Sequence, residues 1–190
     1  MNTRTRYSTI SMALHWAMLL LIVAVYCLME FRGIFPKGSD GREAMKHWHY
    51  VLGLTIFALV WLRIVARVVT GVPPITPAPS RIQHLAATAM HGLLYLLMIG
   101  MPLGGWTILS AENQAVPFYG WTLPPLVAPD ESLAHLVEEI HETFGTIGYG
   151  LLAVHAAAAL YHHFFLRDDT LRRMLPHGHG DQRASNSTNT

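Results

Sequence analysis

The chain has 190 residues, of which 52% are hydrophobic and 13% are charged, and its mean hydropathy is +0.31. So little charge beside long apolar runs indicates a membrane protein, and a formal net charge of +1 argues against nucleic acid as a partner. The single cysteine, Cys27, excludes an internal disulfide and any site built from several thiolates.

Four apolar stretches follow in order, and each is close to the ~20 residues that cross a bilayer as a helix. They cover approximately residues 10–31, 49–69, 86–109 and 141–166. We therefore predict an all-α membrane protein whose four transmembrane helices form one bundle within residues 1–176. The polar tail, residues 177–190, is predicted to be disordered. The first stretch lacks a small-residue cleavage site, which favours a retained span over a signal peptide.

The connections between the spans differ in charge. Nine of the thirteen Lys and Arg residues fall on the side of the two termini, and the other four fall in the first connection, residues 32–46. This asymmetry predicts cytoplasmic termini, with the first and third connections outside, as suits a bacterial inner membrane. The third connection, residues 110–139, holds PFYGWTLPPLVAPD, whose aromatic residues and prolines are typical of the membrane interface.

The last span carries a stripe of histidines. His141, His155 and His162 are separated by fourteen and seven residues, so they lie on nearly one helix face, with Gly148 halfway between the first two. Fourteen residues rise about 21 Å along a helix. Ionisable residues inside a span are functional by default. The stripe therefore predicts ligands at two membrane depths with a smooth groove between them, as two stacked haems require.

The other histidines can be paired with this stripe by depth. His49 begins the second span at the outer face, opposite His141, and Gly53 lies one turn below it. At the inner level His155 has two candidate partners, His15 and His91, and depth alone does not choose between them. Zinc is the competing metal, but it needs tetrahedral closure by ligands close together. Haem fits better, because it takes one histidine from each of two facing helices.

Several segments resemble one known family. HETFGTIGYGLLAVHAAAALYHHFF followed by RDDTLRRMLP is similar to the last span and tail of the bacterial cytochrome b561 family, and YSTISMALHW and AVYCLMEFRGIFP are similar to its first span and loop. The resemblance extends to Pro176. It implies four spans and two haem b groups, each held by two histidines. Without a CxxCH motif, this haem would be non-covalent.

The resemblance also implies roles for individual residues. The inner haem would take His15 and His155, and the outer haem would take His49 and His141. Two further histidines match positions beside the inner haem that are associated with a quinone site, namely His91 and His162. The implied activity is oxidation of superoxide at the outer face and reduction of ubiquinone.

The residue chemistry gives each substrate a candidate site. Superoxide is an anion, and the outer connection offers four cations that could attract it: Arg32, Lys37, Arg42 and Lys46. Nine acidic residues share the outer side, so any attraction must be local. Ubiquinone needs an apolar slot with hydrogen-bonding and protonating groups, for which His162, His91 and Ser11 are the candidates.

Two other functions remain open at this stage. The chain could be an electron-transfer subunit that relays electrons between quinone and a soluble dehydrogenase or hydrogenase docked on the 110–139 connection. It could also be a histidine-rich membrane protein without redox function, such as a metal carrier, which the stripe on the last span makes less favourable.

Overall fold

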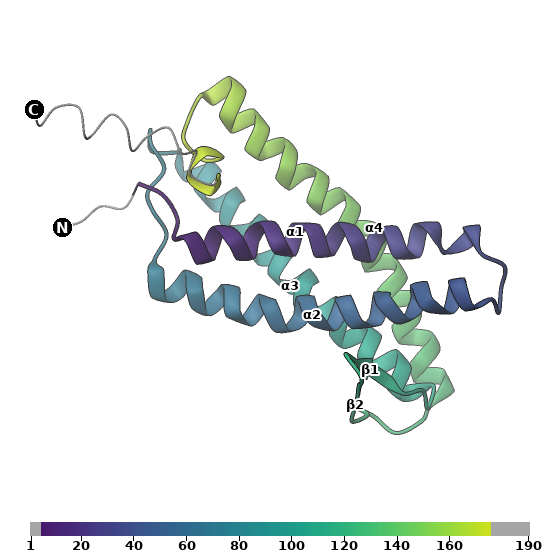
Figure 1. The fold of residues 1–190 in the computed structure, drawn as a ribbon. Coiled ribbons are helices and arrows are strands. Elements are labelled where there is room, and N and C mark those ends of the chain that lie inside the picture. Colours follow the sequence, from purple (N-terminus) through teal and green to yellow (C-terminus); the bar gives the residue numbers. More distant parts are fainter. Residues whose placement is uncertain (1–4, 176–190) are drawn as a thin grey trace, which may run out of the picture.

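The computed structural model describes residues 5–175 and consists mainly of four long helices (Figure 1). These are α1 (Thr9–Glu30), α2 (Asp40–Thr70), α3 (Arg81–Ala111) and α4 (Glu131–Tyr161). All four are long and apolar enough to cross a membrane. The predicted fold class, a four-helix transmembrane bundle, is therefore confirmed. The predicted disordered tail lies outside the described residues.

Short elements complete the described chain. A 3-10 turn, η1 (Phe31–Ile34), follows α1, and a π-helical turn, η2 (His162–Leu166), follows α4. A second 3-10 turn, η3 (Arg172–Met174), lies near the end. The third connection contains an antiparallel hairpin, β1 (Val116–Phe118) and β2 (Trp121–Leu123), which the sequence analysis did not predict.

Polar caps explain why three helices begin before the apolar stretches. The side chains of Ser39 and Asp130 accept hydrogen bonds from backbone amides in the first turns of α2 and α4. Ser80 and Gln83 form a reciprocal capping box at α3. Hydropathy detects only the apolar part of each helix, so the last helix, expected to span the membrane from residue 141, already begins at Glu131.

The helices form two antiparallel pairs. α1 packs along α2, α3 packs along α4, and α2 joins the pairs by packing on α3. The α3–α4 pair is tilted relative to the α1–α2 pair, and the first and last described residues lie at one end of the bundle (Figure 1). We call this the inner end, and the opposite one the outer end. α1 and α4 meet mainly through side chains, which leaves room between their backbones.

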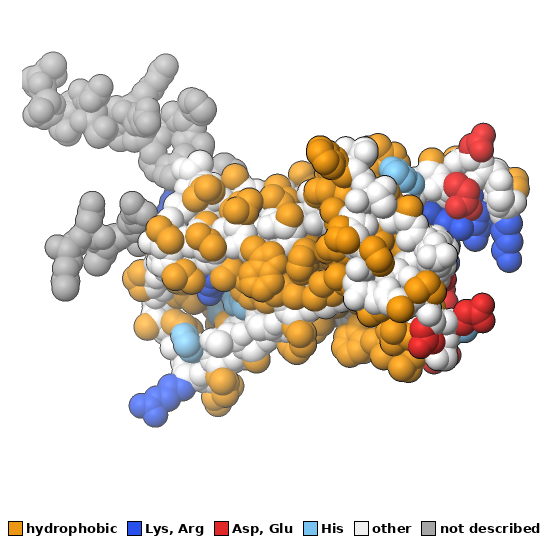
Figure 2. All heavy atoms as spheres, turned by 90° about the horizontal axis from the view of Figure 1, so that it is seen from below, with side chains coloured by type: hydrophobic (Ala, Val, Ile, Leu, Met, Phe, Trp, Pro, Cys, Tyr) orange, Lys and Arg blue, Asp and Glu red, His pale blue; other side chains and the backbone are white. Residues whose placement is uncertain are grey.

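The packed core is small, and much of the apolar surface faces outward. Met18, Ile56 and Val60 form a central cluster, and Leu54, Leu109 and Val116 form a second one under the hairpin. Figure 2 shows an apolar surface between two ends that carry the charged side chains. This distribution is expected when lipid, not water, surrounds the middle of the bundle.

The segment after α4 closes the inner end. Trp16 Nε1 donates to the carbonyl of Met174 at 2.8 Å, and the Tyr7 amide donates to the carbonyl of Arg173 at 3.3 Å. Asp169 and Thr76 exchange two hydrogen bonds, which tie the segment to the α2–α3 connection. The chain's last described residues are therefore fastened to its first helix.

Candidate functional site

The outer end brings His49 and His141 together, as their predicted depths require. Their ring centroids are 6.3 Å apart, with planes inclined at 68°. This separation leaves room for one metal ion bound by both imidazoles, because a metal–nitrogen bond is about 2 Å long. The ring of His49 is further fixed because its Nδ1 donates to the carbonyl of Val25 at 3.3 Å. That bond leaves the lone pair of Nε2 free to bind a metal.

Both histidines line a cavity of about 1180 Å³ at the outer end. Cofactor pockets typically measure about 300–1,000 Å³. Three helices contribute a glycine to its walls, namely Gly53, Gly105 and Gly145. A Cβ at Gly53 would meet nothing within 4 Å, so this wall is smooth. A cavity with glycine-lined walls and two imidazoles that face each other fits a planar macrocycle such as haem.

Gly104 has a role that the sequence analysis did not identify. A Cβ at this position would lie 3.3 Å from Nδ1 of His141, so the glycine makes room for the imidazole. Nδ1 of His141 is buried and has no hydrogen-bond partner among the described residues. A buried ring nitrogen without a partner is unusual and marks the ring as a candidate ligand.

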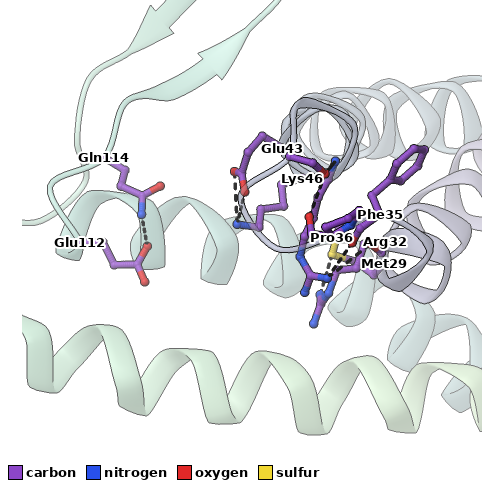
Figure 3. Close-up of polar contacts among 10 residues, drawn as sticks. Met29, Arg32, Phe35, Pro36, Glu43, Lys46, Glu112 and Gln114 are labelled. Atoms are coloured by element: carbon purple, nitrogen blue, oxygen red, sulfur yellow. Dashed lines mark hydrogen bonds and ion pairs between the residues drawn. The ribbon is translucent and has the colours of Figure 1, made fainter.

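The four outer cations predicted to attract superoxide line the same cavity: Arg32, Lys37, Arg42 and Lys46. Figure 3 shows Lys46 turned toward Glu43, its salt-bridge partner at 2.9 Å, and Arg32 beside the sulfur of Met29. The Arg42 guanidinium donates only to carbonyls of the α1–α2 turn. Five glutamates also line the cavity, so the positive field is confined to this turn: Glu30, Glu43, Glu112, Glu138 and Glu142.

The inner end places both candidate partners beside His155. The centroid of His15 is 6.3 Å from that of His155, the same separation as in the outer pair, while that of His91 is 5.6 Å away. His15 comes from α1 and His91 from α3, so His155 faces two helices at once. Within residues 5–175, no group of three His, Cys, Asp or Glu side chains is arranged to hold a metal ion. This arrangement gives the zinc alternative no support.

Ser11, a predicted quinone residue, is buried and already bonded. Its hydroxyl lies 2.9 Å from that of Ser8 and 3.4 Å from that of Thr70, and its carbonyl accepts from Arg63 at 3.3 Å. It lines a small pocket at the inner end together with Arg63 and Arg67. Arg63 is only 9% exposed. In the sequence, Arg63 was only one of the nine cations that predicted the cytoplasmic side.

His162 lies at the inner edge, where α4 gives way to η2. Its Nδ1 and Oδ2 of Asp168 are 2.5 Å apart, and Asp168 is 6% exposed. Burial would raise the pKa of the Asp168 carboxyl, but the hydrogen bonds from His162 and Thr170 outweigh it and hold the pKa below its ordinary value of 3.8. With Nδ1 donating to the carboxylate, Nε2 of a neutral His162 is an acceptor. Sequence reasoning missed Asp168 altogether.

Gly148 does not form part of a smooth groove, as its place on the histidine stripe suggested. A Cβ there would collide with the hydroxyl of Tyr26, which donates to the carbonyl of Gly145 at 2.8 Å. The Tyr26 ring also packs on Tyr149, with centroids 4.3 Å apart, and the Tyr149 hydroxyl donates to Glu30 at 2.5 Å. The two tyrosines therefore pack against each other between α1 and α4, where both border the outer cavity.

Four spans with histidines facing one another across the bundle are the features of a membrane-embedded b-type cytochrome. Comparison with known proteins specifies the family, since residues 6–177 match the model of prokaryotic cytochrome b561. The chain is 38% identical to Cytochrome b561 homolog 1 of Escherichia coli (strain K12), over 90% of this chain and 97% of that protein. It is 32% identical to Probable superoxide oxidase CybB of Yersinia pestis, over 92% of this chain and 98% of that protein.

The chain therefore belongs to the prokaryotic cytochrome b561 family. Membership confirms the predicted resemblance, b-type haem as the cofactor, a role in electron transport, and a multi-pass location in the bacterial inner membrane.

Proposed function

We propose that the chain binds two haem b groups, each between two histidines. The outer group would lie between His49 and His141, and the inner group between His15 and His155. The observation that carries this proposal is the equal 6.3 Å separation of the two pairs. His91, at 5.6 Å from His155, is left as a neighbour of the inner group and not a ligand. Bound haem would supply one-electron carriers at both faces.

We propose further that superoxide is the electron donor at the outer face. Iron with two histidine ligands has no open position, so a donor must react at the cofactor's edge. The outer cavity gives access, and Arg32, Lys37 and Arg42 would draw a small anion toward it. None of these three has a carboxylate partner among residues 5–175. A homologue named as a probable superoxide oxidase supports this donor.

Ubiquinone is the proposed acceptor at the inner edge. Two superoxide anions become two dioxygen molecules, and their two electrons, with two protons, convert one ubiquinone to ubiquinol. Once protonated, His162 would donate the proton on Nε2 to a quinone oxygen and return to the neutral form, while Asp168 holds Nδ1 and so orients the ring. His91 is a second candidate for hydrogen bonding to the quinone. Ser11 is less suited, since its hydroxyl is engaged with Ser8 and Thr70.

An electron-relay subunit is the second candidate function. The acidic residues around the outer cavity would suit a basic redox partner protein. The hairpin is less suited as a docking arm than the long loop predicted from sequence, because it is packed against the bundle. Tyr119 of the hairpin is hydrogen-bonded to Thr55, and Trp106 donates to Pro124.

The deciding experiment is a superoxide pulse applied to purified protein of known haem content, with and without ubiquinone. Fast haem reduction and about one ubiquinol per two superoxide anions support the oxidase. A His141→Ala variant, which should lack the outer haem, is the control that shows whether electrons from superoxide enter through that haem. Haem that is reduced by dithionite and ignores superoxide would contradict the oxidase and favour the relay subunit.

A further inference from the structure

Arg63 is a buried cation within the membrane bundle. It lies in α2, two turns before the helix ends at Thr70, and is 9% exposed. Its guanidinium donates to the carbonyl of Ser11, at 3.3 Å. A guanidinium has five N–H groups and keeps its charge at any physiological pH. One carbonyl does not compensate that charge, and an uncompensated buried charge is strongly unfavourable.

The surroundings of Arg63 contain no acid to balance it. Within residues 5–175, the ion pairs involve Lys46, His135, His162 and Arg173, and none involves Arg63. The pocket that it lines is formed with Tyr7, Ser11, Arg67 and Met174, which adds a second cation and no carboxylate.

Arg63 reaches the inner histidine cluster through α1, because the carbonyl that accepts its hydrogen bond belongs to Ser11, one turn before His15. Its charge also acts on His15, His91 and His155, and that of Arg67 acts on His91. Haem b carries two propionate carboxylates, and arginine binds a carboxylate with two parallel hydrogen bonds. We propose that Arg63, assisted by Arg67, binds a propionate carboxylate of the inner haem. This inference rests on the proposed inner haem site.

The same charge has a consequence for electron flow. A buried cation near a bound haem would favour the reduced state of that haem, because the reduced state carries one positive charge fewer. Arg63 therefore raises the midpoint potential of the inner haem relative to the outer one. The outer histidines have no buried arginine of this kind among the described residues, since the cations there border an open cavity.

The test compares Arg63→Gln and Arg63→Lys in purified protein. Arg81→Gln is the matched control, because Arg81 is an exposed cation at the inner end. Haem per chain, a redox titration that resolves the two haems, and carboxylate bands in redox-difference infrared spectra are measured. We expect Arg63→Gln to lower the inner potential, alter the carboxylate bands and release part of the inner haem. Arg63→Lys should give a smaller shift, and Arg81→Gln none.

Inner potential and carboxylate bands that match the wild type in Arg63→Gln would overturn the proposal. A change of potential confined to the outer haem would also overturn it. So would the finding that removing lipid from the wild type gives the same change of potential as Arg63→Gln, because the anion would then be a lipid phosphate. If Arg63→Gln does not fold, Arg67→Gln must show a smaller shift in the same direction. Failure of the two-haem proposal itself is seen separately, as fewer than two haems in the wild type.

Discussion

The outer and inner ends of the bundle each bring two histidines together at the same separation, but they differ in access and in charge. The outer pair opens on a large cavity bordered by both cations and acids, whereas the inner pair lies behind a C-terminal segment fastened to Tyr7, Trp16 and Thr76. Charge is treated differently as well. Outer cations meet solvent, but Arg63 is buried beside the inner histidines. The contrast suits a small aqueous anion at one end and a membrane-soluble molecule at the other.

Removing a proposed ligand of the outer haem should have the largest effect on the difference between the two ends. We expect His141→Ala to lose the outer haem and keep the inner one, because His141 belongs only to the outer pair. Haem per chain and the optical spectrum of each haem provide the measurement. His47→Ala is the control, since His47 lines the same cavity without facing another histidine there. Two haems per chain in His141→Ala would refute the ligand assignment.

The close packing of Tyr26 from α1 against Gly148 of α4 can be tested by substitution. We expect Gly148→Ala to destabilise the protein by about 2 kcal/mol, because the new methyl group forces Tyr26 out of a packed site. Thermal unfolding in detergent measures this loss. Gly150→Ala should be neutral or stabilising, since a Cβ there meets nothing within 4 Å. Tyr26→Phe should rescue part of the loss, and an absence of rescue would show that the hydroxyl contact is not the cause.

The third prediction concerns the attraction of superoxide by the cations at the outer end. Replacing Arg32, Lys37 and Arg42 together with glutamine should slow haem reduction by superoxide about tenfold and weaken its dependence on ionic strength. Lys46→Gln should have little effect, because Glu43 already neutralises that ammonium. Stopped-flow rates at several salt concentrations provide the measurement. A triple variant with unchanged rate and salt dependence would exclude electrostatic attraction by this turn.

The smallest expected effect concerns the inner edge. Because the pKa of Asp168 is below its ordinary value of 3.8, its bond to His162 contributes stability above that pH, and the contribution is lost as pH falls through the lower folded value. Asp168→Asn should cost about 1 kcal/mol at neutral pH and reduce the loss of stability below pH ~4. Unfolding curves between pH 3 and 7 test this, with Glu139→Gln as an exposed control. Identical pH profiles for wild type and variant would contradict it.

The helices and their membrane class were readable from the sequence, because a run of apolar residues has few alternatives in a bilayer. The proximity of His49 to His141 also followed, since both histidines begin a predicted span at the outer face and so share one membrane depth. Contacts between helices were not readable. The role of Gly148 depends on how far the Tyr26 side chain reaches from α1, and the His162–Asp168 pair depends on a π turn ending in left-handed Arg167 (φ 54°).

Arg63 shows a second limit of sequence reasoning. Counting positive charges predicts the orientation of a chain, but it does not say which face of a helix a given arginine occupies. The hairpin escaped prediction for a different reason. Its strands have three residues each, one of them Pro117, too short for an alternating pattern to be visible.

The use of α4 by both histidine pairs affects how the protein can be made. His15 and His49 leave the ribosome early, but each proposed partner lies on the last helix, and the inner end is closed by residues that follow it. Neither pair can form until α4 has been synthesised. Under the proposed ligand assignment, haem would be inserted into a bundle whose first three helices are already in the membrane. A chain interrupted before α4 would lack one ligand of each proposed pair and should retain neither haem.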